Sequence, residues 1–351
     1  MKNETYFHRV QQQTSTRFWI NNVTREEARM AIEAGAVGCT QNPSYTWKVM
    51  EHPDDKNYVM EKLDAILRDE KNDSEALVKL QRELVGGIAA IFAPMYEQTG
   101  GRQGYVSIQG DPFKEDTDTI IRYAHDNCAA APNIMAKIPV VKEGLEAIEV
   151  LARERIPINA TEVMAVKQAL DVCEVYVKAT KGMKNPAPIY FSHITGIYDE
   201  YLQNYVKDNH ISVSPDALWQ AGMSIAKKVY SMVHEKNYPV GFIGGGARGL
   251  HHFTEMVGAD ACITINWKGA AEALIAQNPP VVQRFFQPTP HSVIDELLEK
   301  VEDYRRGYMV NAISAEEYEG FGPVVHFRTM FEQAWKNALE AVRSRRAAFA
   351  H

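Results

Sequence analysis

The sequence predicts an α/β protein in which eight parallel strands close into a (β/α)8 or TIM barrel. Eight short runs rich in apolar and β-branched residues recur along the chain, and the segments between them follow a helical period. No Gly/Ser linker, internal repeat or low-complexity tract marks a second domain. Strict alternation of strand and helix favours a parallel sheet covered by helices, and eight repeats favour a closed barrel over an open sheet.

The predicted strands are residues 17–21, 36–40, 105–109, 134–138, 157–161, 189–193, 240–244 and 261–265. Helical signals lie between them. Residues 145–152 place apolar side chains on one helical face. Thr24 with Glu27 predicts a capping box, and Ser214 before Pro215 predicts an N-cap with proline at the first helical position.

The chain is longer than a minimal barrel, so the extra length must lie outside the repeats. We expect a helical insertion at 58–95, after the second strand, and a helical C-terminal extension at 288–351 that packs on the barrel. The prediction is a single domain spanning 1–351, with its barrel core at about 17–276.

Composition excludes several classes of function. The chain has 351 residues, with 45 acidic and 38 basic side chains and a net charge of −7, and no basic stripe is available to follow a nucleic-acid backbone. No apolar run approaches the ~20 residues that cross a bilayer, and residues 1–16 are polar rather than signal-like, so we expect no signal peptide. We therefore expect a cytoplasmic protein with no membrane or nucleic-acid partner. The four cysteines are far apart, which favours reduced thiols.

Catalytic groups of a TIM barrel project from the C-terminal ends of its strands. The polar residues at these ends are Asn21, Asn42, Gln109, Lys137, Asn159, Thr161, Ser192 and Arg248. Lys137 has apolar neighbours on both sides, and desolvation would lower its pKa and free the amine to attack a carbonyl. A lysine that snorkels at a strand end explains the same pattern equally well.

Several segments resemble the transaldolase family, in the family's order along the chain. They are FWINN (18–22), GCTQNPS (38–44), VSIQGD (106–111), KIP (137–139), IPINAT (156–161), GGAR (245–248) and GAD (258–260). The stretch from Lys137 to Thr161 is the most specific. The resemblance extends from about residue 17 to 273, and it leaves out the helical insertion, the segment around 181–187 and the C-terminal extension.

The resemblance implies a lysine Schiff-base enzyme of carbohydrate metabolism that transfers a ketol (dihydroxyacetone) unit between sugar phosphates, as in the pentose phosphate pathway. It implies a homo-oligomer that needs no metal and no organic cofactor. The catalytic residues it implies are Lys137, Gln109, Asn21 and Thr161. The substrate-binding residues it implies are Asn42, Thr40, Asn159, Ser192, Arg248 and Gly246, with Arg248 on the phosphate.

Two departures from the family bear on the reaction. Transaldolases carry an aspartate on the first strand and a glutamate on the third, where this chain has Asn21 and Gln109, and an amide does not exchange a proton at neutral pH. A glutamine at this position resembles the fructose-6-phosphate aldolase branch of the family. In that branch a water held by polar side chains transfers the proton. Two alternatives therefore stay open: an aldolase or lyase that cleaves a ketose at the same lysine, and a non-catalytic sugar-phosphate-binding homologue.

The family's second phosphate-binding arginine, which follows the sixth strand, is also missing. Either Lys178, Lys181 or Lys184 replaces it, or the substrate carries less negative charge than a sugar phosphate. The ordinary pKa of a histidine lies near physiological pH, which would suit His193 to shuttle protons. A structural role for His193 is favoured.

Two further motifs are set aside. Residues 244–249 match G-x-G-x-x-G, but no carboxylate follows the next strand to hold a ribose. The pair His251-His252 has no carboxylate or cysteine at a ligand spacing, so we expect no metal there.

Overall fold

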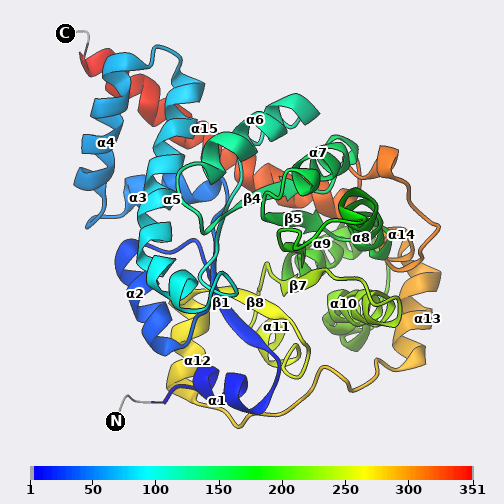
Figure 1. The fold of residues 1–351 in the computed structure, drawn as a ribbon. Helices are drawn as coiled ribbons and strands as arrows, with labels where there is room; N and C mark the ends of the chain where they lie inside the picture. Colours follow the sequence, from blue (N-terminus) through cyan, green and yellow to red (C-terminus); the bar gives the residue numbers. More distant parts are fainter. Residues whose placement is uncertain (1–3, 350–351) are drawn as a thin grey trace.

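The structure is a computed structural model that describes residues 4–349. Eight parallel strands follow one another in chain order around a ring, and β8 closes the ring against β1 (Figure 1). They are β1 (Arg17–Asn21), β2 (Cys39–Thr40), β3 (Val106–Ile108), β4 (Ile134–Pro139), β5 (Ile158–Val163), β6 (Ile189–His193), β7 (Gly241–Gly244) and β8 (Cys262–Asn266). The predicted TIM barrel is confirmed.

The strand bounds follow the predicted runs, and the differences are local. Strand β2 is shorter than 36–40, although a backbone hydrogen bond from Val37 N to Phe18 O continues its pairing with β1. Strand β5 is longer than predicted and its register against β6 shifts after Ala160. This irregularity puts Glu162 at a φ of 65°, a left-handed conformation that is strained for a residue with a side chain.

Helices before, between and after the strands form the outer layer. They are α1 (Tyr6–Gln13), α2 (Arg25–Ala34), α6 (Thr117–Cys128), α7 (Lys142–Arg153), α8 (Val166–Thr180), α9 (Thr195–Asp208), α10 (Pro215–Glu235), α11 (His251–Thr254), the π-helical η1 (Trp267–Ala271) and α12 (Glu272–Gln277). The capping box of Thr24 and Glu27 and the N-cap at Ser214 are both present. Within residues 4–349, no helix is long and apolar enough to cross a membrane.

The predicted insertion after β2 is helical. It comprises α3 (Ser44–Glu51), α4 (Lys56–Asp69) and α5 (Asp73–Gln98), which contact one another. Helix α5 also contacts α2 and β3, so the insertion packs against the barrel wall.

The C-terminal extension is helical too, with α13 (His291–Lys300), α14 (Glu302–Tyr308), the 3-10 turn η2 (Ala315–Glu317) and α15 (Gly322–Phe349). Helix α15, red in Figure 1, contacts α3, α5, α9 and β5. Two hydrogen bonds of 2.6 and 2.7 Å tie Arg345 to Asp64 on α4, and Arg346 donates to Asp73 on α5 at 2.6 Å. The helix is thereby fixed across the end of the barrel where chemistry is expected.

Candidate active site

A cavity of about 270 Å³ lies between the carboxyl ends of the strands and α15. Its predicted lining residues are Asn21, Thr40, Asn42, Lys137, Thr161, Ser192, Gly246 and Arg248. Gln109 and Asn159 are not among the residues that line it. The lining residues that sequence analysis did not single out include Asn22, Ser44, Thr264, Asn266, Phe327, Met330 and Phe331. The structure thus brings most of the predicted site together and adds one face of α15.

Lys137 projects into this cavity from β4, a strand that is buried throughout. Its exposed fraction is 8%, and within residues 4–349 its Nζ makes no hydrogen bond or ion pair. The ring of Phe331 lies 5.5 Å from Nζ. Burial lowers the pKa of Lys137 to about 8, although the carboxylate of Glu162 acts in the opposite direction. About a tenth of this amine is therefore uncharged, and nucleophilic, at pH 7, which is far more than for an ordinary lysine.

Amides and hydroxyls surround the lysine on the β1 and β2 side. Asn21 donates to Asn266 Oδ1 at 2.8 Å and accepts from the hydroxyl of Thr40 at 2.9 Å. Thr40 also lies 2.8 Å from Thr264 Oγ1. These bonds fix the orientation of Asn21, so its carbonyl and amide groups are placed for a neutral polar ligand such as a hydroxyl.

Asn159 lies beneath the cavity rather than on its wall. Its carbonyl oxygen accepts from Ser192 Oγ at 2.7 Å, and its amide donates to Ser107 Oγ at 3.2 Å. The residue therefore orients Ser192, which does line the cavity. Thr161 is different because its buried hydroxyl has no hydrogen-bond partner among the described residues. Thr161 lines the cavity, and its hydroxyl is unpaired but closed off from solvent.

A buried charged cluster lies beside the lysine, across the ends of β3 and β5. Gln109 donates through Nε2 to Glu162 at 3.2 Å and to Glu115 at 3.3 Å. Arg328 of α15 lies 3.3 Å from Glu115 and 3.9 Å from Glu162. Burial raises the pKa of Glu162 despite the opposing pull of Arg328, and burial with the Glu162 charge raises that of Glu115. Gln109 thus positions a carboxyl group whose pKa is shifted toward neutrality.

At the opposite side of the cavity, Arg248 forms an ion pair through Nε with Glu200 of α9. Glu200 also accepts from His326 of α15 at 2.9 Å. Burial acts to raise the pKa of Glu200, but the hydrogen bonds from Arg248 and His326 outweigh burial and hold the pKa below its usual value.

A model of the family described as transaldolase/fructose-6-phosphate aldolase matches residues 18–322. The chain belongs to this family. Among its relatives is a transaldolase of Mycobacterium ulcerans, 26% identical over 62% of this chain and 61% of the relative. A transaldolase of Thiobacillus denitrificans is 24% identical over 66% of this chain and 68% of the relative. A transaldolase 1 of Streptomyces avermitilis is 30% identical over 45% of this chain and 44% of the relative. The chain thus spans about 61% of the length of the first of these relatives.

The lysines expected to replace the family's second phosphate-binding arginine lie outside this cavity. Lys178, Lys181 and Lys184 do not line the cavity, and Lys178 pairs with Glu149 at 3.2 Å. The position after β6 presents Ile194 and Ile197 to the cavity instead.

His193 is buried outside the cavity, and among the described residues its Nε2 has no hydrogen-bond partner. Burial lowers its pKa to about 3, so the ring is neutral at physiological pH. Its Nδ1 lies 3.0 Å from Thr195 Oγ1, and it does not line the cavity.

In the fold, a carboxylate that is distant in sequence lies beside the pair His251-His252. Asp199 from α9 lies with His251 and His252 so that one ligand atom of each falls within 4.8 Å of the others. Sequence spacing could not show this carboxylate, because Asp199 lies on α9 and reaches His252 only in the fold. His252 is already bonded at both ring nitrogens, to Asp199 at 2.9 Å and to the backbone of Arg248 and Gly249. The arrangement serves to hold the loop after β7.

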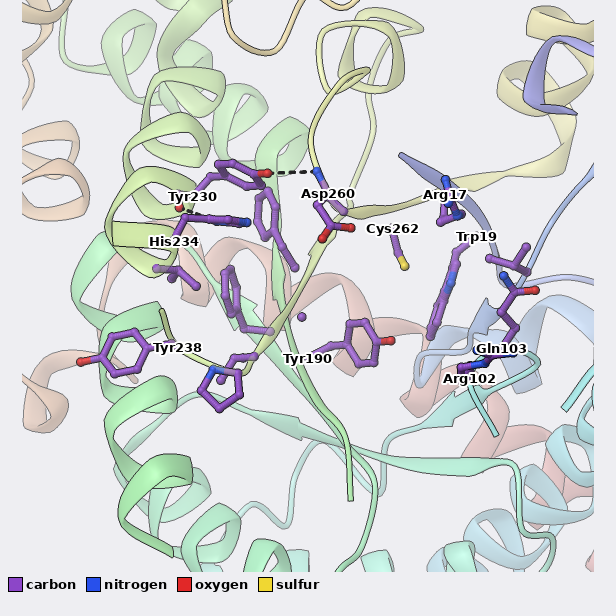
Figure 2. Close-up of a pocket in the computed structure, with 18 of the residues that line it drawn as sticks. Arg17, Trp19, Arg102, Gln103, Tyr190, Tyr230, His234, Tyr238, Asp260 and Cys262 are labelled. Atoms are coloured by element: carbon purple, nitrogen blue, oxygen red, sulfur yellow. Dashed lines mark hydrogen bonds between the residues drawn. The ribbon is translucent and has the colours of Figure 1, made fainter. Parts of the chain in front are cut away.

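A larger cavity, of about 780 Å³, lies at the other end of the barrel, where the strands begin. Figure 2 shows its walls, with the ring of Tyr190 turned toward Trp19 and Asp260 and Cys262 nearby. The two rings have their centroids 5.7 Å apart. Burial raises the pKa of the Cys262 thiol to about 12, so the thiol is not a nucleophile at neutral pH.

Sequence analysis did not identify three residues at or beside the site: Glu162, Arg328 and Phe331. Glu162 directly follows Thr161, and an acidic residue at the end of a buried strand was a usable signal. Arg328 and Phe331 had none, because the helical period of α15 indicates which face is buried but not which part of the barrel it covers.

Proposed function

We propose that this protein is a Schiff-base enzyme that transfers a ketol (dihydroxyacetone) unit from a ketose to an aldehyde acceptor, with Lys137 as the nucleophile. One observation carries the proposal: a buried lysine amine with a pKa of about 8 and no hydrogen bond or ion pair within residues 4–349 faces a cavity of amides and hydroxyls. Such an amine suits attack on a ketone. Family membership supports the same reaction class.

The chemistry balances without an oxidant or reductant. Nζ of Lys137 adds to the ketose carbonyl, and water leaves to give a protonated imine. A base removes the proton of the hydroxyl at the carbon to be released, the carbon–carbon bond breaks, and the electron pair moves to the imine nitrogen to form an enamine. The aldehyde product leaves, the enamine adds to the acceptor aldehyde, and hydrolysis frees the new ketose and the lysine.

We assign the proton transfers to Glu162 acting through the cavity's polar groups. Its buried carboxyl has a raised pKa and is held by Gln109, and Glu162 directly follows Thr161, which lines the cavity. A carboxyl with a pKa shifted toward neutrality can both accept and return a proton. Glu162 would then supply the function that Asn21 and Gln109 cannot, since both are amides.

Product analysis tests the proposal. Incubation with a ketose and an excess of an aldehyde acceptor should yield a new ketose, and omission of the acceptor should slow turnover strongly. If the ketose is instead cleaved equally fast without acceptor, the enzyme is an aldolase at the same lysine. That alternative is favoured by Gln109, because the aldolase branch shares this glutamine. Absence of both products, with no irreversible inactivation by borohydride, would reject the proposal.

A further inference from the structure

The far end of the cavity from Lys137 is formed by the loop after β7 and the start of α9. Arg248, the residue expected to hold a phosphate, stands in this loop. Its charge is balanced by Glu200, whose carboxylate is itself held in the ionised form by Arg248 and by His326. A phosphate placed on Arg248 would therefore come close to a carboxylate, and two like charges at short range repel.

The backbone of the same loop is also engaged. The N–H groups of Arg248 and Gly249 donate to Nδ1 of His252 at 3.3 and 3.2 Å. This ring nitrogen accepts, so Nε2 carries the hydrogen and donates to Asp199 at 2.9 Å. Asp199 is fixed in turn by the N–H of Gly222 at 2.6 Å. Two backbone donors that would suit an anion are thus directed toward an imidazole nitrogen.

The remaining neighbours are apolar. Ile194 and Ile197 line this end of the cavity, and a Cβ built on Gly246 would lie 2.5 Å from Ile194, which shows how closely the isoleucine covers the loop. Among the lining residues that the structure describes, only Lys137 and Arg248 carry a positive charge, and Lys137 is needed for the imine.

We propose that the ketose ends here in an uncharged hydroxymethyl group and that the protein selects unphosphorylated ketoses over their phosphate esters. The Arg248–Glu200 pair suits such a group, because a hydroxyl can donate to the carboxylate and accept from the guanidinium at once. This inference rests on the proposed function, since it names the substrate class of the same site.

The experiment compares D-fructose with D-fructose 6-phosphate, which differ only at this end. Two quantities are measured for each sugar: the rate at which borohydride inactivates the protein in its presence, and the binding affinity by calorimetry. Wild type should prefer fructose in both assays. Glu200→Gln removes the opposing charge and should raise the efficiency with fructose 6-phosphate by at least about tenfold, with much less change for fructose.

Glu255→Gln is the matched control, because Glu255 also pairs with an arginine, Arg284 at 3.5 Å, but this arginine, unlike Arg248, does not line the cavity. It should leave the ratio of the two substrates unchanged. The ratio is taken within each variant, so a loss of folded protein does not change it. A wild-type preference for fructose 6-phosphate, or Glu200→Gln with an unchanged ratio, overturns the inference.

Failure of the proposed function is a separate result. If neither sugar inactivates the protein with borohydride, the Schiff-base proposal fails, and calorimetry alone decides the substrate class. Tighter binding of fructose 6-phosphate than of fructose then contradicts the inference, and tighter binding of fructose supports it.

Discussion

The two ends of the barrel differ in what the same strands place there. At the start of β1, Arg17 and Trp19 line a cavity of about 780 Å³, whereas at its end Asn21 lines one of about 270 Å³. The larger cavity is walled by aromatic rings and by a thiol with a raised pKa. The smaller one holds an amine with a lowered pKa. Cavity size therefore does not locate the chemistry here, and strand direction does.

The largest expected effect concerns the lysine of the smaller cavity. Lys137→Met should lower turnover by at least about 10⁴-fold, because the covalent intermediate cannot form. Lys227 is the control, since burial also lowers its pKa but it lies on α10 and donates to Gln287 O at 2.6 Å. Lys227→Met should leave steady-state turnover unchanged. Equal losses in both variants would contradict the assignment.

The next effect concerns the buried carboxyl beside the lysine. Glu162→Gln should lower the turnover number by about 10²- to 10⁴-fold, the usual contribution of a general acid or base, while a ketose is still trapped on Lys137. Glu115→Gln is the comparison, because Glu115 shares Gln109 and Arg328 but is not adjacent to Thr161. We expect a much smaller loss for Glu115→Gln. If imine trapping also disappears in Glu162→Gln, the residue acts on structure rather than on proton transfer.

The pH dependence of imine formation should show the environment of the lysine directly. Below pH 8 Lys137 is mostly the unreactive ammonium, so the rate of borohydride inactivation should rise about tenfold per pH unit up to about 8 and then level off. An ordinary lysine would place this limb near its usual pKa of about 10.4. Because the carboxylate of Glu162 acts to raise the pKa of Lys137, Glu162→Gln should move the limb to lower pH. A limb near 10 would contradict the desolvated lysine.

The smallest effect is expected at the other end of the barrel. Tyr190→Phe removes a hydroxyl from the large cavity of Figure 2 and leaves the aromatic contact with Trp19 in place. Steady-state turnover should stay within about twofold of wild type and the free energy of unfolding within about 0.5 kcal/mol. A larger loss of turnover would show that this cavity contributes to the reaction.

The sequence predicted the barrel well because each strand is a compact apolar run and each helix repeats at its own period. Lys137 was predictable for the same reason, since a charged residue inside such a run is conspicuous. Glu162, the proposed proton carrier, was harder to predict. Glu162 reaches Gln109 in a strand whose pairing becomes irregular after Ala160, and strand patterns do not predict such a shift.

Sequence patterns also could not predict contacts between segments that are distant along the chain. Glu200 neutralises Arg248, and Arg328 of α15 meets Glu115, only because the helices pack in one particular arrangement around the barrel. The same holds for Asp199 and His252, which have no recognisable ligand spacing along the chain.

The most direct test of the account is to find where a ketose is bound covalently. The protein is incubated with D-fructose, and separately with D-fructose 6-phosphate, then reduced with borohydride, digested and mapped by mass spectrometry. The account predicts one reduced adduct, on Lys137, formed in wild type and absent from Lys137→Met. An adduct on another lysine, or turnover of a ketose without any adduct, would contradict it.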